Sequence, residues 1–309
     1  MFISVIIPTF NRANTLKECL VALCEQDFPL ESFEVIVVDD GSKDETRDVA
    51  DKFKTRLPNL KYVHQSNRGQ GIARNLGVKK AIGDIIVFIG DDILVKEDFL
   101  TEHLRYHLRF IDENDAVLGF TTWHPKLTIT PFMKWLENGS CILGKYGGHQ
   151  FAYEKLKDKE MADYNFFYTS NISLNRSLLE KYPFDPGLSG YGWEDIELGY
   201  RLHNRVDLKI HYNPGAIGFH NHAMTEESLK ARMRSIGLYA RIINKKYPEL
   251  KKVPDWKKRI IFSLLSNKLT LSLLGLIRNI SQGTYCNLYF FALSKKYFME
   301  GINQKTTNF

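Results

Sequence analysis

The stretch Ile85-Ile86-Val87-Phe88-Ile89-Gly90-Asp91-Asp92 decides the fold. Its five successive apolar residues predict a strand that is buried on both faces, and the tight turn after it presents two carboxylates. The same order occurs earlier, where Val35-Ile36-Val37-Val38 precedes Asp39-Asp40-Gly41-Ser42. Leucines at helical spacing precede this earlier strand. Alternation of this kind predicts an α/β fold, with a parallel sheet covered by helices on both faces.

Polar residues follow three of the predicted strands. They are Thr9-Phe10-Asn11-Arg12, Asp39-Asp40-Gly41-Ser42 and Gly90-Asp91-Asp92. In open α/β sheets, ligands bind beyond the carboxyl ends of the strands. Two adjacent carboxylates in that place suit a hard divalent cation that bridges diphosphate oxygens. The alternative for a bare Asp-Asp pair is a solvated acidic turn, and the position after a buried strand favours the metal.

The loops around Asp40 and Arg74 suggest further contacts with a nucleotide. Asp40 can accept hydrogen bonds from a base or ribose, and a helix N-cap role for Asp40 or Ser42 is the alternative. The stretch Gly69-Gln70-Gly71-Ile72-Ala73-Arg74 imitates a dinucleotide fingerprint. We reject that interpretation because Arg74 replaces the third glycine and the motif does not follow the first strand. Arg68 and Arg74 are instead predicted to lie near a phosphate-bearing site.

Two later motifs carry candidate chemistry. In Gly190-Tyr191-Gly192-Trp193-Glu194-Asp195-Ile196-Glu197, glycines flank two aromatic residues and acids open a helix. Acids in a first helical turn are usually dipole and capping residues. The aromatic pair indicates sugar stacking instead, which makes Asp195 a candidate general base. His220-Asn221-His222 follows a predicted strand, and its two imidazoles suit a metal, with surface histidines as the alternative.

Composition bounds the class of protein. The chain has 309 residues, of which 44% are hydrophobic and 25% charged, as in an ordinary globular protein. None of its four cysteines forms a C-x-x-C pair, so neither a zinc ribbon nor a disulfide framework is predicted. Reduced thiols in a cytosolic setting are expected. The first residues read as a strand, so no signal peptide is predicted.

The C-terminal part is strongly basic. Residues 225–309 hold sixteen Lys and Arg against five Asp and Glu, and two apolar runs lie among them. Neither run reaches the ~20 residues of a membrane span. Basic clusters beside amphipathic helices predict peripheral attachment to an anionic membrane surface, and a helical cap on the catalytic domain or a second subunit is an equal alternative. Nucleic-acid binding would leave the apolar runs unexplained, so it is not predicted.

The order of these motifs resembles glycosyltransferase family 2. The matching segments are Val5-Ile6-Ile7-Pro8-Thr9-Phe10-Asn11-Arg12, Val38-Asp39-Asp40-Gly41-Ser42, Asn67-Arg68-Gly69-Gln70 with Ala73-Arg74-Asn75, Gly90-Asp91-Asp92 and Gly192-Trp193-Glu194-Asp195. The resemblance covers roughly residues 2–225 and implies the GT-A fold, a Rossmann-like, mostly parallel sheet flanked by helices. It also implies a nucleotide-sugar-binding half at 1–120, an acceptor-binding and catalytic half at 121–225, and a basic helical extension at 226–309.

The resemblance also implies donor and metal contacts. The residues implied to line the nucleoside pocket are Pro8, Thr9, Arg12 and Asp40. Asp91 and Asp92 are similar to the D-x-D element, with Asp92 ligating the metal and Asp91 nearer the ribose. His220 is similar to a histidine that completes the metal site in relatives, with His222 as the alternative. Many members carry Asp where this chain has Gly90, which leaves the division of labour between Asp91 and Asp92 open.

On the acceptor side, Asp195 matches the catalytic base of the inverting members. The residues implied to contact the acceptor are Tyr191, Trp193, Glu194 and Asn171. For Asn171 the resemblance leaves open whether the contact is with the acceptor or with the donor. The implied cation is Mn²⁺ or Mg²⁺, since both suit an oxygen-rich site with one imidazole. Inversion is favoured because retaining GT-A relatives tend to lack an Asp at this place.

The function expected from the resemblance is transfer of a sugar from a nucleoside diphosphate to a hydroxyl of a glycan or a lipid-linked acceptor. UDP is the commonest base, with dTDP and GDP open. We expect the protein in the cytoplasm, peripherally at the cytoplasmic face of the membrane. A sugar-phosphate nucleotidyltransferase would need a glycine-rich loop after the first strand, and Pro8-Thr9-Phe10-Asn11-Arg12 has no glycine. A catalytically inactive nucleotide-sugar-binding protein would not need Asp92, Asp195 and His220 together. The sequence specifies neither linkage nor oligomeric state.

Overall fold

The computed structural model describes residues 1–110, 112–139, 151–280 and 284–304, which fall into two compact units. The first, here called the sheet unit, comprises Met1–Leu127, Leu156–Ser189 and Glu194–His222. The second, here called the helical unit, comprises Thr128–Lys155, Gly190–Trp193 and Ala223–Phe309. The predicted boundaries at residues 120 and 225 divide the chain by function, and they stay a prediction.

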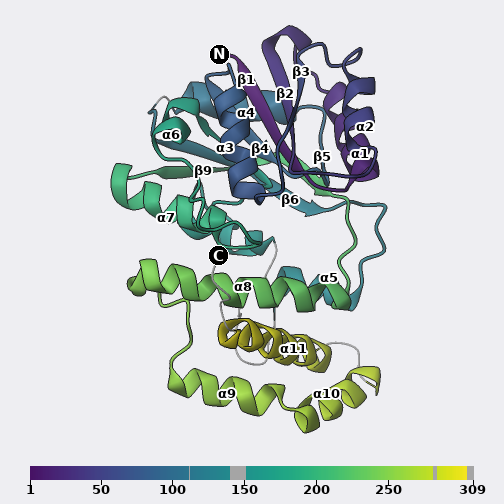
Figure 1. Cartoon of the computed structure of the whole chain (residues 1–309), viewed down its shortest axis with the longest axis vertical. Helices are drawn as coiled ribbons and strands as arrows, with labels where there is room; N and C mark the ends of the chain where they lie inside the picture. Colours follow the sequence, from purple (N-terminus) through teal and green to yellow (C-terminus); the bar gives the residue numbers. More distant parts are fainter. Residues whose placement is uncertain (111, 140–150, 281–283, 305–309) are drawn as a thin grey trace. The chain divides into compact units, whose positions relative to one another are not determined.

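One sheet forms the centre of the sheet unit (Figure 1). Its strands are β1 (Ile3–Thr9), β2 (Phe33–Asp39), β3 (Leu60–His64), β4 (Ile85–Ile89), β5 (Ile93–Val95), β6 (Asp115–Trp123), β7 (Met161–Ala162), β8 (Asn171–Asn175) and β9 (Lys209–His220). They lie in the order β3-β2-β1-β4-β8-β6-β9-β5, with β7 paired to β9.

Strand direction changes across this sheet. Strands β3, β2, β1 and β4 are parallel, as the alternation of strands and helices predicted. Strand β8 is antiparallel to both β4 and β6, and β9 is parallel to β6 but antiparallel to β5 and β7. The predicted α/β fold is therefore confirmed, with a sheet that is mixed as a whole.

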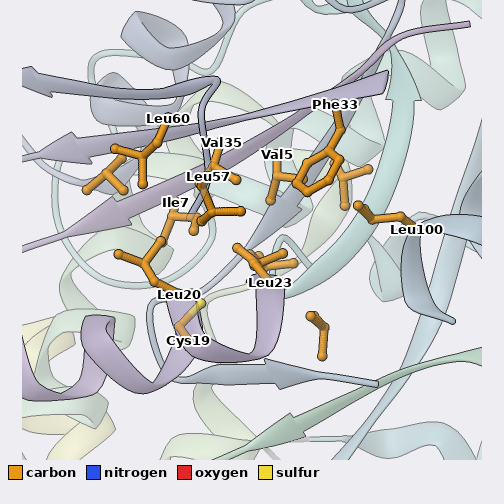
Figure 2. Close-up of a cluster of buried hydrophobic side chains, with 14 of the residues drawn as sticks. Val5, Ile7, Cys19, Leu20, Leu23, Phe33, Val35, Leu57, Leu60 and Leu100 are labelled. Carbon is orange, nitrogen blue, oxygen red and sulfur yellow. The ribbon is translucent and has the colours of Figure 1, made fainter. Parts of the chain in front are cut away.

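Helices cover the sheet. The sheet unit contains α1 (Ala13–Cys24), η1 (Leu30–Ser32), α2 (Thr46–Phe53), α3 (Gln70–Lys80), α4 (Phe99–Arg109), η3 (Tyr164–Phe166), α6 (Arg176–Lys181) and α7 (Glu194–Val206). Leu20 and Leu23 of α1 point at Val5, Ile7 and Val35 of the sheet, and all five are buried (Figure 2). Burying a leucine stabilises the fold by on the order of 1.5–3 kcal/mol. This cluster fixes β1 and β2, whose ends carry the first polar motifs.

Helix α3 packs closely on β1 and β2. A Cβ atom added at Gly77 would lie 2.5 Å from Cγ2 of Ile6 and 3.2 Å from Cγ2 of Val38. A larger residue would push the helix off the sheet, because neither neighbour lies at the end of a flexible chain. The position of α3 matters because its second turn carries Arg74.

The helical unit contains α5 (Pro131–Asn138), α8 (Glu226–Lys246), η4 (Pro248–Leu250), α9 (Trp256–Ser266), α10 (Lys268–Ile280) and α11 (Thr284–Asn303), and η2 (Ala152–Leu156) leads back to the sheet unit. Helix α11 lies between α8 and the pair α9–α10 (Figure 1). Ion pairs at 2.6 Å between Arg234 and Glu300 and at 2.8 Å between Arg278 and Glu226 tie the bundle together. Among the described residues no single helix is long and apolar enough to cross a bilayer; α9 and residues 268–278 would suffice together but are bent by 56°.

Candidate functional site

The loops after β1, β2 and β4 meet at the carboxyl edge of the parallel strands. Thr9 pairs with Asp39 in register, and Asp39 pairs with His64. Asp91 and Asp92 follow β4, which lies on the other side of β1. The predicted donor-side motifs are therefore brought together. Pro8 is itself buried inside β1, next to Val38.

Arg12 bridges the two aspartates. Its Nη1 lies 2.8 Å from Oδ1 of Asp91, and its Nη2 lies 3.0 Å from Oδ2 of Asp92. The hydroxyl of Thr9 donates to Oδ2 of Asp91 at 2.8 Å. The positive charge beside the two aspartates therefore comes from Arg12, which the resemblance implied to line the nucleoside pocket.

The pKa values of the two acids are shifted in opposite directions. Burial raises the pKa of Asp91 to about 7, and although Arg12 and the Thr9 hydroxyl oppose this, the charge of Asp92 adds to it. Burial acts in the same direction on Asp92, but His220 and Arg12 outweigh it and lower the pKa. Asp92 is consequently the acid that stays ionised, which is the state a metal ligand needs.

Asp92 and His220 form the protein side of a candidate metal centre. His220 ends β9, is buried, and has Nε2 3.5 Å from Oδ2 of Asp92. His222 is exposed, with its ring centroid 6.3 Å from that of His220. Within the described part of the chain, no set of three or more His, Cys, Asp or Glu could hold a metal ion. A carboxylate and an imidazole do fit Mn²⁺ or Mg²⁺, provided that a bound diphosphate supplies further oxygens.

Asp40 organises the loop that leads into α3. Its carboxylate accepts hydrogen bonds from Nε2 of Gln65 and from the backbone N–H groups of Arg68 and Gly69, at 2.7 to 2.8 Å. Neither Asp40 nor Ser42 caps α2, which is the correction to the alternative interpretation: Asp44 accepts from the N–H of Thr46 instead. The carboxylate of Asp40 shapes the donor-side loop, while the side chain of Arg68 is exposed.

The acidic pair at the start of α7 is held against α3 by an ion pair. Arg74 and Glu194 are both buried, with Nη1 of the arginine 3.2 Å from Oε1 of the glutamate. The guanidinium also donates to Gln70 at 3.1 Å and lies 5.6 Å from the ring centroid of Phe184. The sequence predicted that Arg74 lies near a phosphate-bearing site. In the structure its guanidinium contacts Glu194 of the acidic pair instead.

Asp195, the predicted general base, lies in the first turn of α7. Its side chain is only partly buried, and Oδ1 accepts from the N–H of Ile196 at 2.7 Å. Burial and then the charge of Glu194 raise its pKa to about 7, against the opposing charge of Arg74. A base works best when its pKa lies near the working pH. Tyr168, which the sequence gave no reason to select, lies close enough for the charge of Asp195 to help raise its pKa.

Tyr191 and Trp193 belong to the helical unit, where they pack on α8. The indole Nε1 of Trp193 donates to the carbonyl of Ile236 at 2.8 Å, and Nζ of Lys252 lies 4.7 Å from the ring centroid. Trp193 adopts φ +80°, in the left-handed region that non-glycine residues rarely occupy. Strain of this kind collects at functional segments. Tyr191 is exposed, with Arg232 5.1 Å from its ring centroid.

Asn171 lies in the core. Its side chain is fully buried, donates to the carbonyls of Phe120 and Ala216 at 3.1 and 2.9 Å, and bonds Nε2 of His103 at 3.0 Å. All of these partners belong to the protein, so the predicted contact with donor or acceptor gains no support from this position. The side chain instead joins β8 to β6, β9 and α4.

Known proteins that are similar to this chain are glycosyltransferases. A family model described as Glycosyl transferase family 2 matches residues 4–182. Validoxylamine A glucosyltransferase of Streptomyces hygroscopicus subsp. jinggangensis is 31% identical over 216 residues, which cover 65% of this chain and 51% of that protein. The uncharacterized glycosyltransferase YfnE of Bacillus subtilis is 30% identical over 242 residues, covering 65% of this chain and 60% of that one. The chain thus spans only about half of the length of the relatives it matches.

Among solved structures, the mannosyltransferase PcManGT of Pyrobaculum calidifontis, in complex with GDP-Man and Mn²⁺, is similar with a TM-score of 0.62 and 18% identity. The match covers 96% of this chain and 86% of that one. At this identity the likeness concerns the fold alone, and it agrees with a GT-A architecture.

Proposed function

The chain belongs to glycosyl transferase family 2, and from this membership and the site at the carboxyl edge we propose that it is an inverting, divalent-metal-dependent glycosyltransferase. The donor would be a nucleoside-diphosphate sugar, with UDP as the favoured base. The acceptor would be a hydroxyl of a glycan or a lipid-linked sugar. The observation that carries the proposal is the meeting of the motifs after β1, β2 and β4 at one edge of the sheet, with Nε2 of His220 3.5 Å from Oδ2 of Asp92.

The proposed reaction is a single displacement at the anomeric carbon. Asp195 accepts the proton of the acceptor hydroxyl while the new C–O bond forms. The bond from the anomeric carbon to the diphosphate breaks, and its electron pair leaves with the phosphate oxygen. Attack from the side opposite the leaving group inverts the anomeric configuration. Proton transfer to such a base typically contributes ~10²–10⁴-fold to a rate.

The donor would bind along the ends of β1, β2 and β4. Thr9, Arg12 and Asp40 lie at this edge, and we assign Asp91 to the ribose. A cation held by Asp92 and His220 would supply stabilisation of the negative charge on the leaving diphosphate. Tyr191 and Trp193 lie just before the base in the chain, and we assign them to the acceptor.

The test is release of nucleoside diphosphate from a panel of UDP-, dTDP- and GDP-sugars with Mn²⁺ present. We expect slow hydrolysis with one donor class, abolished by chelation and by Asp195→Asn. Once an acceptor is found, the anomeric configuration of the product by NMR tests inversion. Turnover that is unchanged by both Asp195→Asn and a chelator would overturn the mechanism, while a retained configuration would overturn inversion alone.

A further inference from the structure

Helices α9 and α10 both expose large apolar side chains to solvent. Seven large apolar side chains on them are between 51% and 85% exposed: Trp256, Ile260, Ile261, Leu264, Leu269, Leu273 and Leu276. On α9 they recur at intervals of four, one and three residues, and on α10 at four and three, so each helix carries them on one face. We call these seven residues the apolar face. Exposed apolar patches of this kind mark interaction sites.

The opposite sides of both helices are already packed. The ring of Phe262 in α9 meets that of Phe291 in α11 at 6.4 Å between centroids, and Nζ of Lys295 lies 5.4 Å from the Phe262 ring. In α10, Leu274 is buried, and Arg278 stacks 4.6 Å from the ring centroid of Tyr289. The helical unit therefore holds α9 and α10 in place with the apolar face outward.

Apart from Asp255, which caps α9, the charge on α9 and α10 is positive, and Arg278 is already paired with Glu226. Residues 256–278 contain five Lys and Arg and no Asp or Glu. Lys257, Lys258 and Lys268 are exposed. A cavity of about 800 Å³ is lined mainly by α8, with one residue of α9 and two of α11, and its cationic lining residues are Arg241, Lys245 and Arg259. No acidic residue lines it. An apolar face with cations beside it complements an anionic membrane, which has apolar acyl chains inside and negatively charged phosphates at its surface.

We propose that the apolar face of α9 and α10 lies on an anionic membrane, with its side chains among the acyl chains and the neighbouring cations on lipid phosphates. Helices of 11 and 13 residues extend roughly 16–20 Å, well short of a ~30 Å hydrocarbon core. They are bent by 56° at their junction, and their inner sides are bound to α11. Helices that lie flat in the membrane–water interface fit their short length, their bend and their attachment to α11.

A second copy of the chain fits this face less well. A two-fold contact brings the same patch of each subunit together. Two patches that both carry Lys and Arg would then meet, with no acidic side chain between residues 256 and 278 of either copy to compensate. Lipid phosphates provide that compensation.

The test is co-flotation of the full chain with vesicles, and it does not depend on sugar transfer. Phosphatidylglycerol–phosphatidylcholine vesicles should bind the protein at low salt, release it at high salt, and exceed pure phosphatidylcholine in affinity. Leu273→Gln with Leu276→Gln should abolish binding, and Lys257→Gln with Lys258→Gln should weaken it by about 30-fold, from roughly 1 kcal/mol for each lysine. All four side chains are exposed, so these variants should fold.

Matched controls use exposed residues of the sheet unit. Ile82→Gln with Leu108→Gln removes two apolar side chains, and Lys157→Gln with Lys159→Gln removes two charges. Both controls should bind vesicles like the wild type. The proposal is overturned if the wild type stays unbound at low salt, or if the control pairs weaken binding as much as the test pairs. A dimer that Leu273→Gln with Leu276→Gln dissociates, without vesicle binding by the wild type, would assign the face to a second copy.

Discussion

Nη1 of Arg74 lies 3.2 Å from Oε1 of Glu194, and both side chains are buried. Glu194 directly precedes Asp195, and its charge is the strongest influence after burial in raising the pKa of Asp195. Arg74 acts in the opposite direction. The buried ion pair thus adjusts the proton affinity of the candidate base, and each partner has a predictable effect on the pH dependence of the reaction.

Replacing Glu194 with Gln should move the acidic limb of the pH–rate profile to lower pH. The substitution removes a negative charge that disfavours ionisation of Asp195, so the pKa of Asp195 falls from about 7. The base must be ionised to accept a proton, and activity therefore persists to lower pH. The measurement is kcat/KM against pH. Glu197→Gln, one turn further along α7 and paired with Arg201, is the control that should leave the limb in place. A limb that moves upward in E194Q would contradict the assignment.

Asp195→Asn should fold and bind donor like the wild type, yet lose transfer. The amide is nearly the same size as the carboxyl group but does not accept the proton, and we expect a fall of ~10²–10⁴-fold in kcat. Single-turnover kinetics measure the chemical step, and calorimetry measures donor binding. Near wild-type transfer with intact donor affinity would remove Asp195 from the mechanism.

Metal and donor should bind together. We propose Asp92 and His220 as two ligands, and among the described residues no group of three or more His, Cys, Asp or Glu could hold the ion alone. Mn²⁺ alone should therefore bind weakly, and a nucleoside diphosphate should strengthen it by completing the coordination shell. Titration calorimetry with and without UDP measures the difference. We expect His220→Ala to abolish the enhancement and His222→Ala to preserve it, and the reverse pattern would transfer the ligand role to His222.

Local patterns predicted the strands that carry the site. The apolar runs before Asp39 and Asp91 are strands β2 and β4, and the basic extension expected to be helical from residue 226 begins with α8 at Glu226. Hydrophobic runs and strand-end motifs are properties of neighbouring residues, so a single sequence contains them.

Pairings between distant residues were not predictable in this way. Arg74 meets Glu194 across 120 positions, and Asn171 joins strands β6 and β9. The antiparallel direction of β8 is likewise a tertiary feature, since five residues do not show which neighbour they pair with. These contacts between residues far apart in the sequence decide which polar side chains face each other and which are left to face a ligand.

Asn171→Ala should destabilise the sheet unit. The change leaves the carbonyls of Phe120 and Ala216 and Nε2 of His103 without the partner they now have, and each buried polar group left unsatisfied costs about 1–3 kcal/mol. We expect a loss of about 3 kcal/mol or more in the free energy of unfolding, measured by urea denaturation. Asn175→Ala, at the other end of β8 and only partly buried, is the control and should cost less than half as much. Equal losses would show that Asn171 has no special part in joining these strands.

Arg12→Gln should strengthen the binding of Mn²⁺ in the absence of donor. The guanidinium lies 2.8 Å from Asp91 and 3.0 Å from Asp92, so a cation that binds these acids must compete with it. A neutral side chain removes the competitor, and at pH 8, where Asp91 is largely ionised, we expect affinity to rise by about tenfold, since an opposite charge at this range typically shifts proton affinity by 1–3 pKa units. Donor affinity should fall at the same time, because the positive charge beside the phosphates is lost. Calorimetry with Mn²⁺ alone and then with UDP separates the two effects, and Arg68→Gln, an exposed side chain on the neighbouring loop, should leave binding of the metal alone unchanged. If Mn²⁺ binds the Arg12 variant more weakly than the wild type, Arg12 does not compete for the aspartates, and its bridge serves to hold them in place.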